Sequence, residues 1–490
     1  MKCKVVLICF LMVLLIVQIA AAEPYEGYTY NSYGERVPSP NGYLPSKVIQ
    51  GINLGIGHFK NPADIVTDQY DNLYILDSGN QRIVILDSEF NLKKVINQFQ
   101  YNGKVEKLND PTGIFVDKNG IIYIADKGNG RVLSLNQDGI IQKIYGKPET
   151  SLIGGNIIYG PRNLVVNSIG TIYIISDNIN QGLVSIDPDG NFLGFYGSNK
   201  IQATLEILNE MLWRKFSTRE QIKQRQSFQP VEYSNLYIDE DDFVYTSTAY
   251  EGVTKAQLKK LNPMGNNLLP DITYGDLQPE FINNAPVNSA FVDICADDDE
   301  FIYGLDRNMG RIFMYNQRSD LLMVFGKIGN NAGNFGDPVA LETIGDKVIV
   351  LDSLKCSITI FEPTLYGKKI REAVLLHEAG KFEEALKPWE IVKELNTNYD
   401  MAYVGIGRAM ELTENYEAAM ENFYVGNNKF LYSDAKKEHR TEILRANFSV
   451  YVTVFLLAIV LIRIAVKYRK KIKAYLLHVN LKRKGVNVNE

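Results

Sequence analysis

The sequence is poor in the residues on which zinc sites and serine hydrolases depend. Only four of its 490 residues are histidines, and only His58 lies in the first three quarters of the chain. A catalytic zinc site typically needs two or three histidine ligands, and a Ser-His-Asp triad needs a histidine beside its nucleophile. Both kinds of enzyme are therefore disfavoured. No phosphate-binding loop, Cys-x-x-Cys pair or dinucleotide fingerprint occurs either.

Cysteine and positive charge are also scarce through the long middle of the chain. Cys295 and Cys356 are the only cysteines beyond residue 22, so at most one disulfide could form and the protein is not a disulfide scaffold. Residues 1–22 and 467–490 together with Arg463 carry +10 in a chain of net charge −5, which leaves −15 on residues 23–462. Such an acidic region argues against nucleic acid or an anionic surface as partner.

Two long apolar runs stand at the ends. Residues 1–22 combine a basic start, an apolar stretch and a small-residue boundary, typical of a secretory signal peptide; an uncleaved anchor is the alternative. The second run, 448–466, is interrupted only by Arg463 and is just long enough to span a bilayer as a helix. Eight basic residues follow it, against Glu490 alone. Basic flanks stay in the cytoplasm, so we expect a single-pass protein of the cell membrane with an extracellular ectodomain and a cytoplasmic tail.

A sequence pattern repeats through the middle of the chain. Short stretches alternate apolar and polar residues between Gly, Asn and Asp, as in many-stranded antiparallel sheets. Five positions of one copy recur 49 residues later: Pro62, Asp68, Tyr74, Asp77 and Arg82 return as Pro111, Asp117, Tyr123, Asp126 and Arg131. Four weaker copies follow, and four-stranded units repeated in this way predict a β-propeller.

The number of copies predicts six blades, with five or seven as alternatives. The sixth copy ends near Pro363, before a fourth strand, and residues around Lys47–Gln50 could supply that strand and close the ring. Residues 201–226 interrupt the repeat with apolar residues at helical spacing. We expect a helical insertion there, either a partner-binding arm or a helix packed on the propeller.

The repeated Pro, Asp, Tyr, Asp and Arg pattern resembles the NHL-repeat family of propellers over roughly residues 45–362. The resemblance implies the fold rather than one activity, because that family includes binding platforms and unrelated enzymes. Exported NHL proteins with a C-terminal anchor are similar to accessory components of bacterial carbohydrate uptake systems. The resemblance therefore implies a membrane protein or transporter subunit as partner.

The sequence period becomes helical from Lys368 onwards. Apolar and small residues recur 34 positions apart, which is similar to the tetratricopeptide repeat. Two helical hairpins would fit between 368 and 432, either to bind a protein or as a rigid spacer. The expected order is a signal peptide at 1–22, a linker at 23–44, the propeller at 45–363, a tetratricopeptide-like stalk at 364–445, a transmembrane helix at 446–467 and a basic tail at 468–490.

The aspartates that recur in the repeat are expected to be structural, because an active site is one place on a ring. Such a carboxylate can accept hydrogen bonds from turn amides, and the repeated arginines could pair with it. The aspartates are Asp77, Asp126, Asp177, Asp306 and Asp352, and the arginines are Arg82, Arg131 and Arg311.

Positions that vary around the ring are better candidates for a site. Just after each repeated proline, at the start of the innermost strand, the copies hold Asp64, Gly113, Asn163, Asn235 and Asp293. At the channel entrance, the side chains of Asp64, Asn163, Asn235 and Asp293 would offer oxygen ligands suited to Ca²⁺ or Mg²⁺. The set is similar to that of gluconolactonase-like propellers, in which a carboxylate acts as base, although Asp64 stands where a glutamate is usual. A polar, water-filled mouth is the alternative.

Aromatic residues also gather in the loops expected at the mouth: Tyr159, Tyr233 and Tyr250, with Arg162 beside them. Aromatic rings with polar neighbours suit sugar binding, although ordinary loop tyrosines are the alternative. Three functions therefore stay open: a surface binding or scaffold protein for a glycan or a partner protein, a metal-dependent lactonase or hydrolase, and a purely structural surface protein. The sequence favours the first, as an accessory to a carbohydrate transport system.

Overall fold

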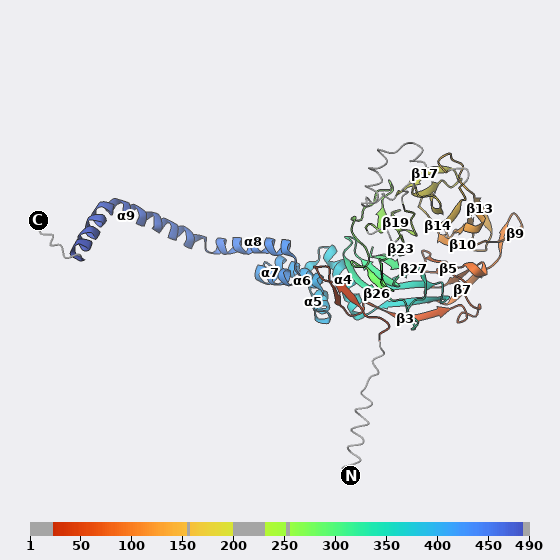
Figure 1. Ribbon diagram of the computed structural model, residues 1–490, viewed down its shortest axis with the longest axis horizontal. Coiled ribbons are helices and arrows are strands. Elements are labelled where there is room, and N and C mark those ends of the chain that lie inside the picture. The colour runs from red at the N-terminus through yellow and green to blue at the C-terminus, as the bar shows by residue number, and fades with distance from the viewer. Residues whose placement is uncertain (1–22, 154–156, 199–230, 251–254, 484–490) are drawn as a thin grey trace, which may run out of the picture. The chain divides into compact units, whose positions relative to one another are not determined.

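The computed structural model describes residues 23–153, 157–198, 231–250 and 255–483 (Figure 1). The expected signal peptide and the expected insertion at 201–226 lie outside these residues. The chain divides into two compact units. One runs to Ala379 and takes in Ile391–Tyr399, and the other comprises Gly380–Glu390 and the residues from Asp400 onwards.

Six antiparallel sheets form a β-propeller, as the repeat predicted (Figure 1). Each innermost strand contacts that of the next blade, and the last contacts the first, so the ring is closed. In chain order these strands are β4 (Asp64–Thr67), β10 (Pro111–Val116), β14 (Gly160–Val166), β18 (Leu236–Ile238), β23 (Phe291–Ala296) and β27 (Pro338–Ile344).

The outer strands complete each blade in sequence order. Blade 1 adds β5 (Leu73–Asp77), β6 (Arg82–Leu86) and β7 (Leu92–Ile96); blade 2 adds β11 (Ile122–Asp126), β12 (Arg131–Leu135) and β13 (Ile141–Tyr145). Blade 3 adds β15 (Ile172–Asp177), β16 (Leu183–Ile186) and β17 (Phe192–Tyr196), and blade 4 adds β19 (Val244–Ser247) and β20 (Leu258–Leu261). Blade 5 adds β24 (Ile302–Asp306), β25 (Arg311–Tyr315) and β26 (Leu321–Phe325).

The ring closes where the sequence predicted. Blade 6 adds β28 (Lys347–Asp352), β29 (Ser357–Pro363) and, from the other end of the propeller, β3 (Tyr43–Gln50). Gln50 lies opposite Ser357 and Lys47 opposite Ile360. The two ends of the propeller are therefore held together by one sheet.

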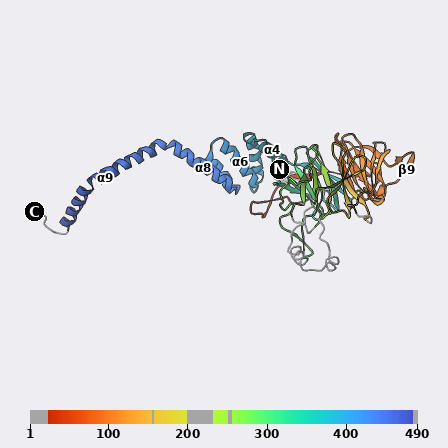
Figure 2. The ribbon, with the colours of Figure 1, turned by 90° about the horizontal axis from the view of Figure 1, so that it is seen from above.

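The core lies between neighbouring blades because alternate residues of each strand face opposite sides of its sheet. Between blades 1 and 2, Leu76, Ile83, Ile122 and Leu133 are fully buried in one cluster. Two short hairpins extend this frame: β8 (Phe99–Tyr101) with β9 (Lys104–Glu106), and β21 (Glu280–Ile282) with β22 (Ala285–Val287). The β8–β9 hairpin projects beyond the blades in both Figure 1 and Figure 2.

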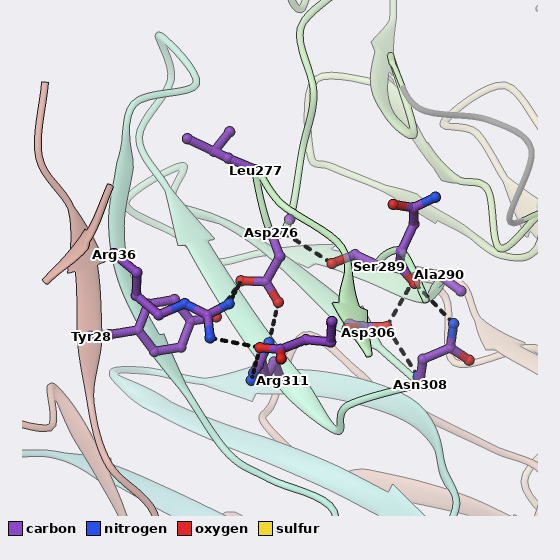
Figure 3. Close-up of polar contacts among 12 residues, drawn as sticks. Tyr28, Arg36, Asp276, Leu277, Ser289, Ala290, Asp306, Asn308 and Arg311 are labelled. Carbon is purple, nitrogen blue, oxygen red and sulfur yellow. Dashed lines mark hydrogen bonds and ion pairs between the residues drawn. The ribbon is translucent and has the colours of Figure 1, made fainter. Parts of the chain in front are cut away.

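Residues 23–44, expected to be a linker, form a hairpin and begin β3. The hairpin strands β1 (Tyr28–Tyr30) and β2 (Arg36–Pro38) extend blade 5 to six strands. An ion-pair cluster attaches them, in which Arg36 and Arg311 both contact Asp276 and Glu280 (Figure 3). The ring of Tyr28 lies beneath both guanidinium groups, at 4.2 and 5.3 Å from ring centre to guanidinium carbon. Two positive and two negative charges thus balance at this junction.

The predicted pairing of repeated aspartates with repeated arginines is confirmed in two blades and wrong in a third. Arg82 Nε donates to Asp77 at 2.7 Å, and Arg131 Nε donates to Asp126 at 2.8 Å. In blade 5, Asp276 and Glu280 bind Arg311 instead, and Asp306 Oδ2 has no hydrogen-bond partner among the described residues. The sequence could not show this, because the competing carboxylates come from the segment between β20 and β23, which is not part of the repeat.

Six helices follow the propeller: α4 (Leu365–Glu378), α5 (Phe382–Leu395), α6 (Asp400–Leu412), α7 (Tyr416–Val425), α8 (Lys429–Ala446) and α9 (Phe448–Arg483). Helix α4, expected at the start of the stalk, belongs to the same compact unit as the propeller. Helix α9 is long and apolar enough to cross a membrane. Cys295 and Cys356 are not paired with each other.

Candidate functional site

The variable positions at the start of the inner strands form a ring inside the propeller. In blades 2, 3 and 5 these positions follow a bulge of the inner strand: Gly113 faces Ala125, Asn163 faces Ile175 and Asp293 faces Leu305. The corresponding residue in blade 6 is Ala340. Three of the polar side chains touch in sequence around the ring, and Asn235 stands between Asn163 and Asp293.

A chain of hydrogen bonds links this ring from blade to blade. Asn163 Nδ2 donates to Asn235 Oδ1, and Asn235 Nδ2 donates to Asp293 Oδ1 at 2.6 Å. Asp293 Oδ2 then accepts the Leu341 amide of blade 6 at 2.6 Å. Blade 1 repeats this last contact, since Asp64 Oδ2 accepts the Ile114 amide of blade 2 at 2.9 Å. The ring therefore joins neighbouring blades as well as lining the channel.

Gly113 leaves room for this arrangement. A Cβ atom there would lie 2.6 Å from the Arg162 carbonyl oxygen and 2.7 Å from Asn163 Cα, both fixed backbone atoms. Gly113→Ala is therefore expected to destabilise the protein by roughly 1–3 kcal/mol, as overpacking does elsewhere. Thermal unfolding measures the loss. Gly146→Ala is the matched control, because no heavy atom lies within 4 Å of a Cβ there; equal losses in the two variants would contradict the steric explanation.

Three buried carboxyl groups face the same space. Burial raises the pKa of Asp64 to about 7, against hydrogen bonds from two backbone amides and Asn163 that lower it. Burial also raises the pKa of Glu342 to about 8. The pKa of Asp293 lies well above its usual range, first through burial and then through the nearby charge of Asp64. Because like charges repel, the ionisation of one of these carboxyl groups opposes the ionisation of the others.

The ring opens into a cavity of about 820 Å³. In each blade the lining residues run from the inner strand to the turn after it, for example from Asp64 to Asp71 and from Asp293 to Glu300. In blades 2 and 6 the lining begins one residue after the ring position, at Ile114 and Leu341. The ring therefore lies at the inner end of the cavity. The expectation that it marks the channel entrance at the start of the inner strands is corrected accordingly.

The charge of the cavity is strongly one-sided. Of the described residues that line it, thirteen are aspartate or glutamate and one, Lys118, is basic. The Lys118 ammonium contacts the Glu240 carbonyl at 3.4 Å rather than a ring carboxylate. Walls of low polarisability concentrate such a field inside a cleft. The cavity is thus suited to positive charge and unsuited to phosphate or carboxylate ligands.

The predicted metal ligands lie together, but their oxygens already accept hydrogen bonds. Two carboxylates and two amide oxygens are suitable donors for Ca²⁺. Each side-chain oxygen of Asp64, Asn163, Asn235 and Asp293 accepts at least one hydrogen bond, either from a backbone amide or from the side-chain amide of a neighbouring asparagine in this set. No group of three or more His, Cys, Asp or Glu placed to hold a metal is found among the described residues. Metal binding therefore stays a prediction.

The structure corrects the predicted aromatic site. Tyr159 and Tyr233 are only 6% and 3% exposed and pack in the core between blades, so neither offers a ring face to a sugar. Arg162 binds Asp177 at 2.8 Å and Glu232 at 3.3 Å. Tyr250 alone is exposed. The sequence placed these tyrosines in loops correctly but could not show that the loops fold back against the sheets.

Glu342 was missed by the sequence reasoning. It lies two residues after Ala340 on β27. Because alternate residues of a strand face the same side, Glu342 faces the channel as the ring positions do. The alternation of the inner strand was a usable signal, because it places Glu342 on the same face of β27 as Ala340. With Asp64 and Asp293 it completes a group of three buried acids.

Comparisons with known proteins find one short family match and several solved structures of low identity to this chain. The NHL repeat model matches residues 108–133, and a search of curated protein sequences finds no match. A virginiamycin B lyase from Staphylococcus aureus is 11% identical, with 66% of this chain and 100% of that chain covered and a TM-score of 0.40. A gluconolactonase from Xanthomonas campestris is also 11% identical, with coverages of 66% and 97% and a TM-score of 0.37. The extracellular domain of a putative one component system from B. thetaiotaomicron is 13% identical, with coverages of 70% and 40% and a TM-score of 0.34.

Proposed function

We propose that this chain is a membrane-anchored binding protein that takes up a cationic ligand in the channel of its propeller. The observation that carries the proposal is the lining of the cavity, which contains thirteen acids and one lysine, and of these acids Asp239 and Asp297 pair with cations from outside the lining. Buried carboxylates without a nearby cation are costly, and a bound positive charge removes that cost. The free energy of binding would thus come from charges that the empty fold leaves poorly compensated.

The size of the cavity favours an extended cation over a single metal ion. Its volume of about 820 Å³ suits a ligand of many atoms, and its acids come from five blades, in four of them from the turn after the inner strand. A polyamine or a basic peptide carries positive charges at comparable spacings. The expected glycan ligand loses its support with the burial of Tyr159 and Tyr233.

Helix α9 supports the anchoring. None of its most apolar 18-residue window is buried, and basic residues follow that window. In a bilayer the basic residues after the helix would stay in the cytoplasm, and the propeller before it would lie outside. The protein would present its ligand to a membrane partner such as a transporter subunit, and the association with carbohydrate uptake stays an expectation about that partner.

Spermine is a suitable first probe of the full-length protein in detergent micelles. We expect it to raise the melting temperature at low salt, because a ligand that binds only the native state stabilises it. The rise should shrink with added salt and should be larger at pH 8.5 than at pH 5.5. The acids Asp64 and Glu342, with pKa values raised to about 7 and 8, are charged only at the higher pH.

Two variants make this test specific. Glu342→Gln keeps the acceptor for the Thr343 amide but removes a cavity charge, and it should weaken the effect of spermine. Asp138→Asn removes the same charge from an exposed pair with Lys94 outside the cavity, and it should leave the effect unchanged. The proposal fails if spermine does not stabilise the protein at pH 8.5 and low salt, or if both variants respond alike.

A metal-dependent lactonase or hydrolase is the second candidate. It is favoured by the contact of Asn163, Asn235 and Asp293 in one ring and by the raised pKa of Asp64, which suits a general base near neutral pH. Equilibration with Ca²⁺ followed by dialysis and metal analysis tests it. One retained equivalent that is lost in Asp293→Asn would support this candidate, and no retained metal would remove it.

A further inference from the structure

An aspartate and a tyrosine six residues apart recur at the acidic end of the propeller. The aspartate opens the turn after the inner strand, and the tyrosine lies on the second strand. We call each such pair a clamp; the clamps are Asp68–Tyr74, Asp117–Tyr123, Asp239–Tyr245 and Asp297–Tyr303 in blades 1, 2, 4 and 5. Blade 3 has an amide in the acidic position, in the pair Asn167–Tyr173.

The clamp of blade 5 holds an arginine. Arg371 of helix α4 places Nη1 at 2.5 Å from Asp297 Oδ2 and 2.6 Å from the Tyr303 hydroxyl. Its Nη2 donates to Asp299 at 2.6 Å. Tyr303 also donates to Asp297 at 2.9 Å, so carboxylate, phenol and guanidinium form one connected group. This shows how the turn end of a blade binds a cationic side chain.

The clamp of blade 4 holds a lysine. The Lys260 ammonium lies 3.5 Å from Asp239 Oδ2 and 5.1 Å from the ring centre of Tyr245. In blade 1 neutral groups take the place of the cation: Asn72 donates to Asp68, and Gln137 Nε2 donates to the Tyr74 hydroxyl at 2.9 Å. In all three blades the tyrosine is at most 2% exposed.

The clamp of blade 2 differs in that both of its side chains remain partly exposed. Asp117 Oδ1 accepts the amides of Asn119 and Ile121, and among the described residues no cationic side chain contacts either Asp117 or Tyr123. Burial and the nearby charge of Asp117 raise the pKa of Tyr123 to about 12, so the phenol keeps its proton. Lys118 is directed elsewhere, toward the Glu240 carbonyl. Asp117 also lines the acidic cavity.

We propose that Asp117 and Tyr123 bind the guanidinium or ammonium group of an arginine or lysine side chain on a basic partner segment. The inference rests on the proposed function and names the ligand class, a basic peptide rather than a metal ion. A partner's side chain would take the position that Arg371 takes in blade 5. Carboxylate and phenol would both accept from the cation, and the cavity acids beyond would attract the rest of the segment.

A fluorescent hexapeptide of alternating glycine and arginine, titrated into the full-length protein in detergent, tests the inference. Asp117→Asn and Tyr123→Phe should each weaken binding about tenfold, since a hydrogen bond to a charged group is lost. Asparagine keeps the acceptor that the turn amides need, as Asn167 does for the Thr171 amide at 2.8 Å. Unchanged melting temperatures would show that both variants fold.

Two further variants separate a clamp from general charge attraction. Asp346→Asn removes one charge from the corresponding turn of blade 6, where no clamp tyrosine stands, and it should change affinity less than twofold. Asn167→Asp creates a clamp in blade 3 and should strengthen binding. Equal losses in Asp117→Asn and Asp346→Asn would overturn the inference.

The outcome for the proposed function is read separately, from spermine. A peptide that binds Asp117→Asn and Tyr123→Phe as tightly as the wild type refutes the clamp, while stabilisation by spermine would still support a cationic ligand. Failure of the wild-type protein to bind the peptide also refutes the clamp. Failure of spermine to stabilise the wild-type protein at pH 8.5 and low salt removes the proposed function as well.

Discussion

Arg371→Ala is expected to lower the free energy of unfolding of the propeller unit by roughly 3–5 kcal/mol, as the loss of one partner of a buried pair does elsewhere. The arginine is 7% exposed and binds Asp297, which is 8% exposed, together with Tyr303 and Asp299. Burial already raises the pKa of Asp297, and Arg371 is the first influence that lowers it. Without the arginine, a buried carboxylate would face a phenol and a second carboxylate.

The pH dependence identifies the cause. Because the pKa of Asp297 would rise further in Arg371→Ala, the group could escape the cost by protonation, and the loss should be smaller at pH 5 than at pH 8. Denaturant unfolding at both pH values measures it. Lys369→Ala on the same helix is the control, since Lys369 pairs with Glu372 one turn away and such pairs contribute about 0.3–0.5 kcal/mol. Losses of similar size in the two variants would show that α4 is stabilised by other contacts.

The propeller could be predicted because its repeat records local physics. The 49-residue spacing of the first two copies shows where strands and turns recur, and the missing strand after Pro363 left Lys47–Gln50 as its natural source. The ring positions Asp64, Asn163, Asn235 and Asp293 followed from the same alignment, since one register places equivalent residues around one axis. A repeat therefore predicts where side chains point as well as which strands pair.

Contacts made outside the repeat could not be predicted in this way. The sequence of helix α4 predicts the start of a helical stalk, and nothing in it shows that Arg371 contacts blade 5. Tyr159 and Tyr233 were placed in loops, but their burial depends on packing between blades. Arg311 occupies the repeat position correctly, yet Asp276 and Glu280 compete for it from an insertion. Each error concerns a long-range contact that no local pattern encodes.

Because Arg311 binds Asp276 and Glu280, the repeated aspartate of blade 5, Asp306, has an environment unlike that of its counterparts (Figure 3). Asp126 of blade 2 accepts Asn109 N at 2.7 Å on one oxygen, and Asn129 Nδ2 and Arg131 Nε at 2.8 Å on the other. Asp306 of blade 5 accepts two backbone amides on Oδ1, at 2.9 and 3.0 Å, and nothing among the described residues on Oδ2. Burial raises the pKa of Asp306 to about 7, with a smaller contribution from the charge of Asp276 and opposition from Arg311.

The same substitution should therefore have opposite effects in the two blades. Asp126→Asn turns an accepted hydrogen bond from Arg131 into a contact between two donors and should cost roughly 1.5–3 kcal/mol. Asp306→Asn keeps an oxygen for the two amides and removes a charge that the fold does not compensate. At pH 8 it should leave the protein as stable as the wild type or more stable.

The sign of the pH dependence provides the decisive comparison. An acid whose pKa is higher in the folded state than in the unfolded state binds more protons when folded, so stability falls as pH rises from about 4 toward 7. Asp306→Asn should remove this part of the slope, whereas Asp126→Asn should retain it. Denaturant unfolding of the wild type and both variants at pH 5 and pH 8 measures the difference. A loss in Asp306→Asn as large as that in Asp126→Asn at pH 8 would mean that Arg311 pairs with Asp306 in solution rather than with Asp276 and Glu280.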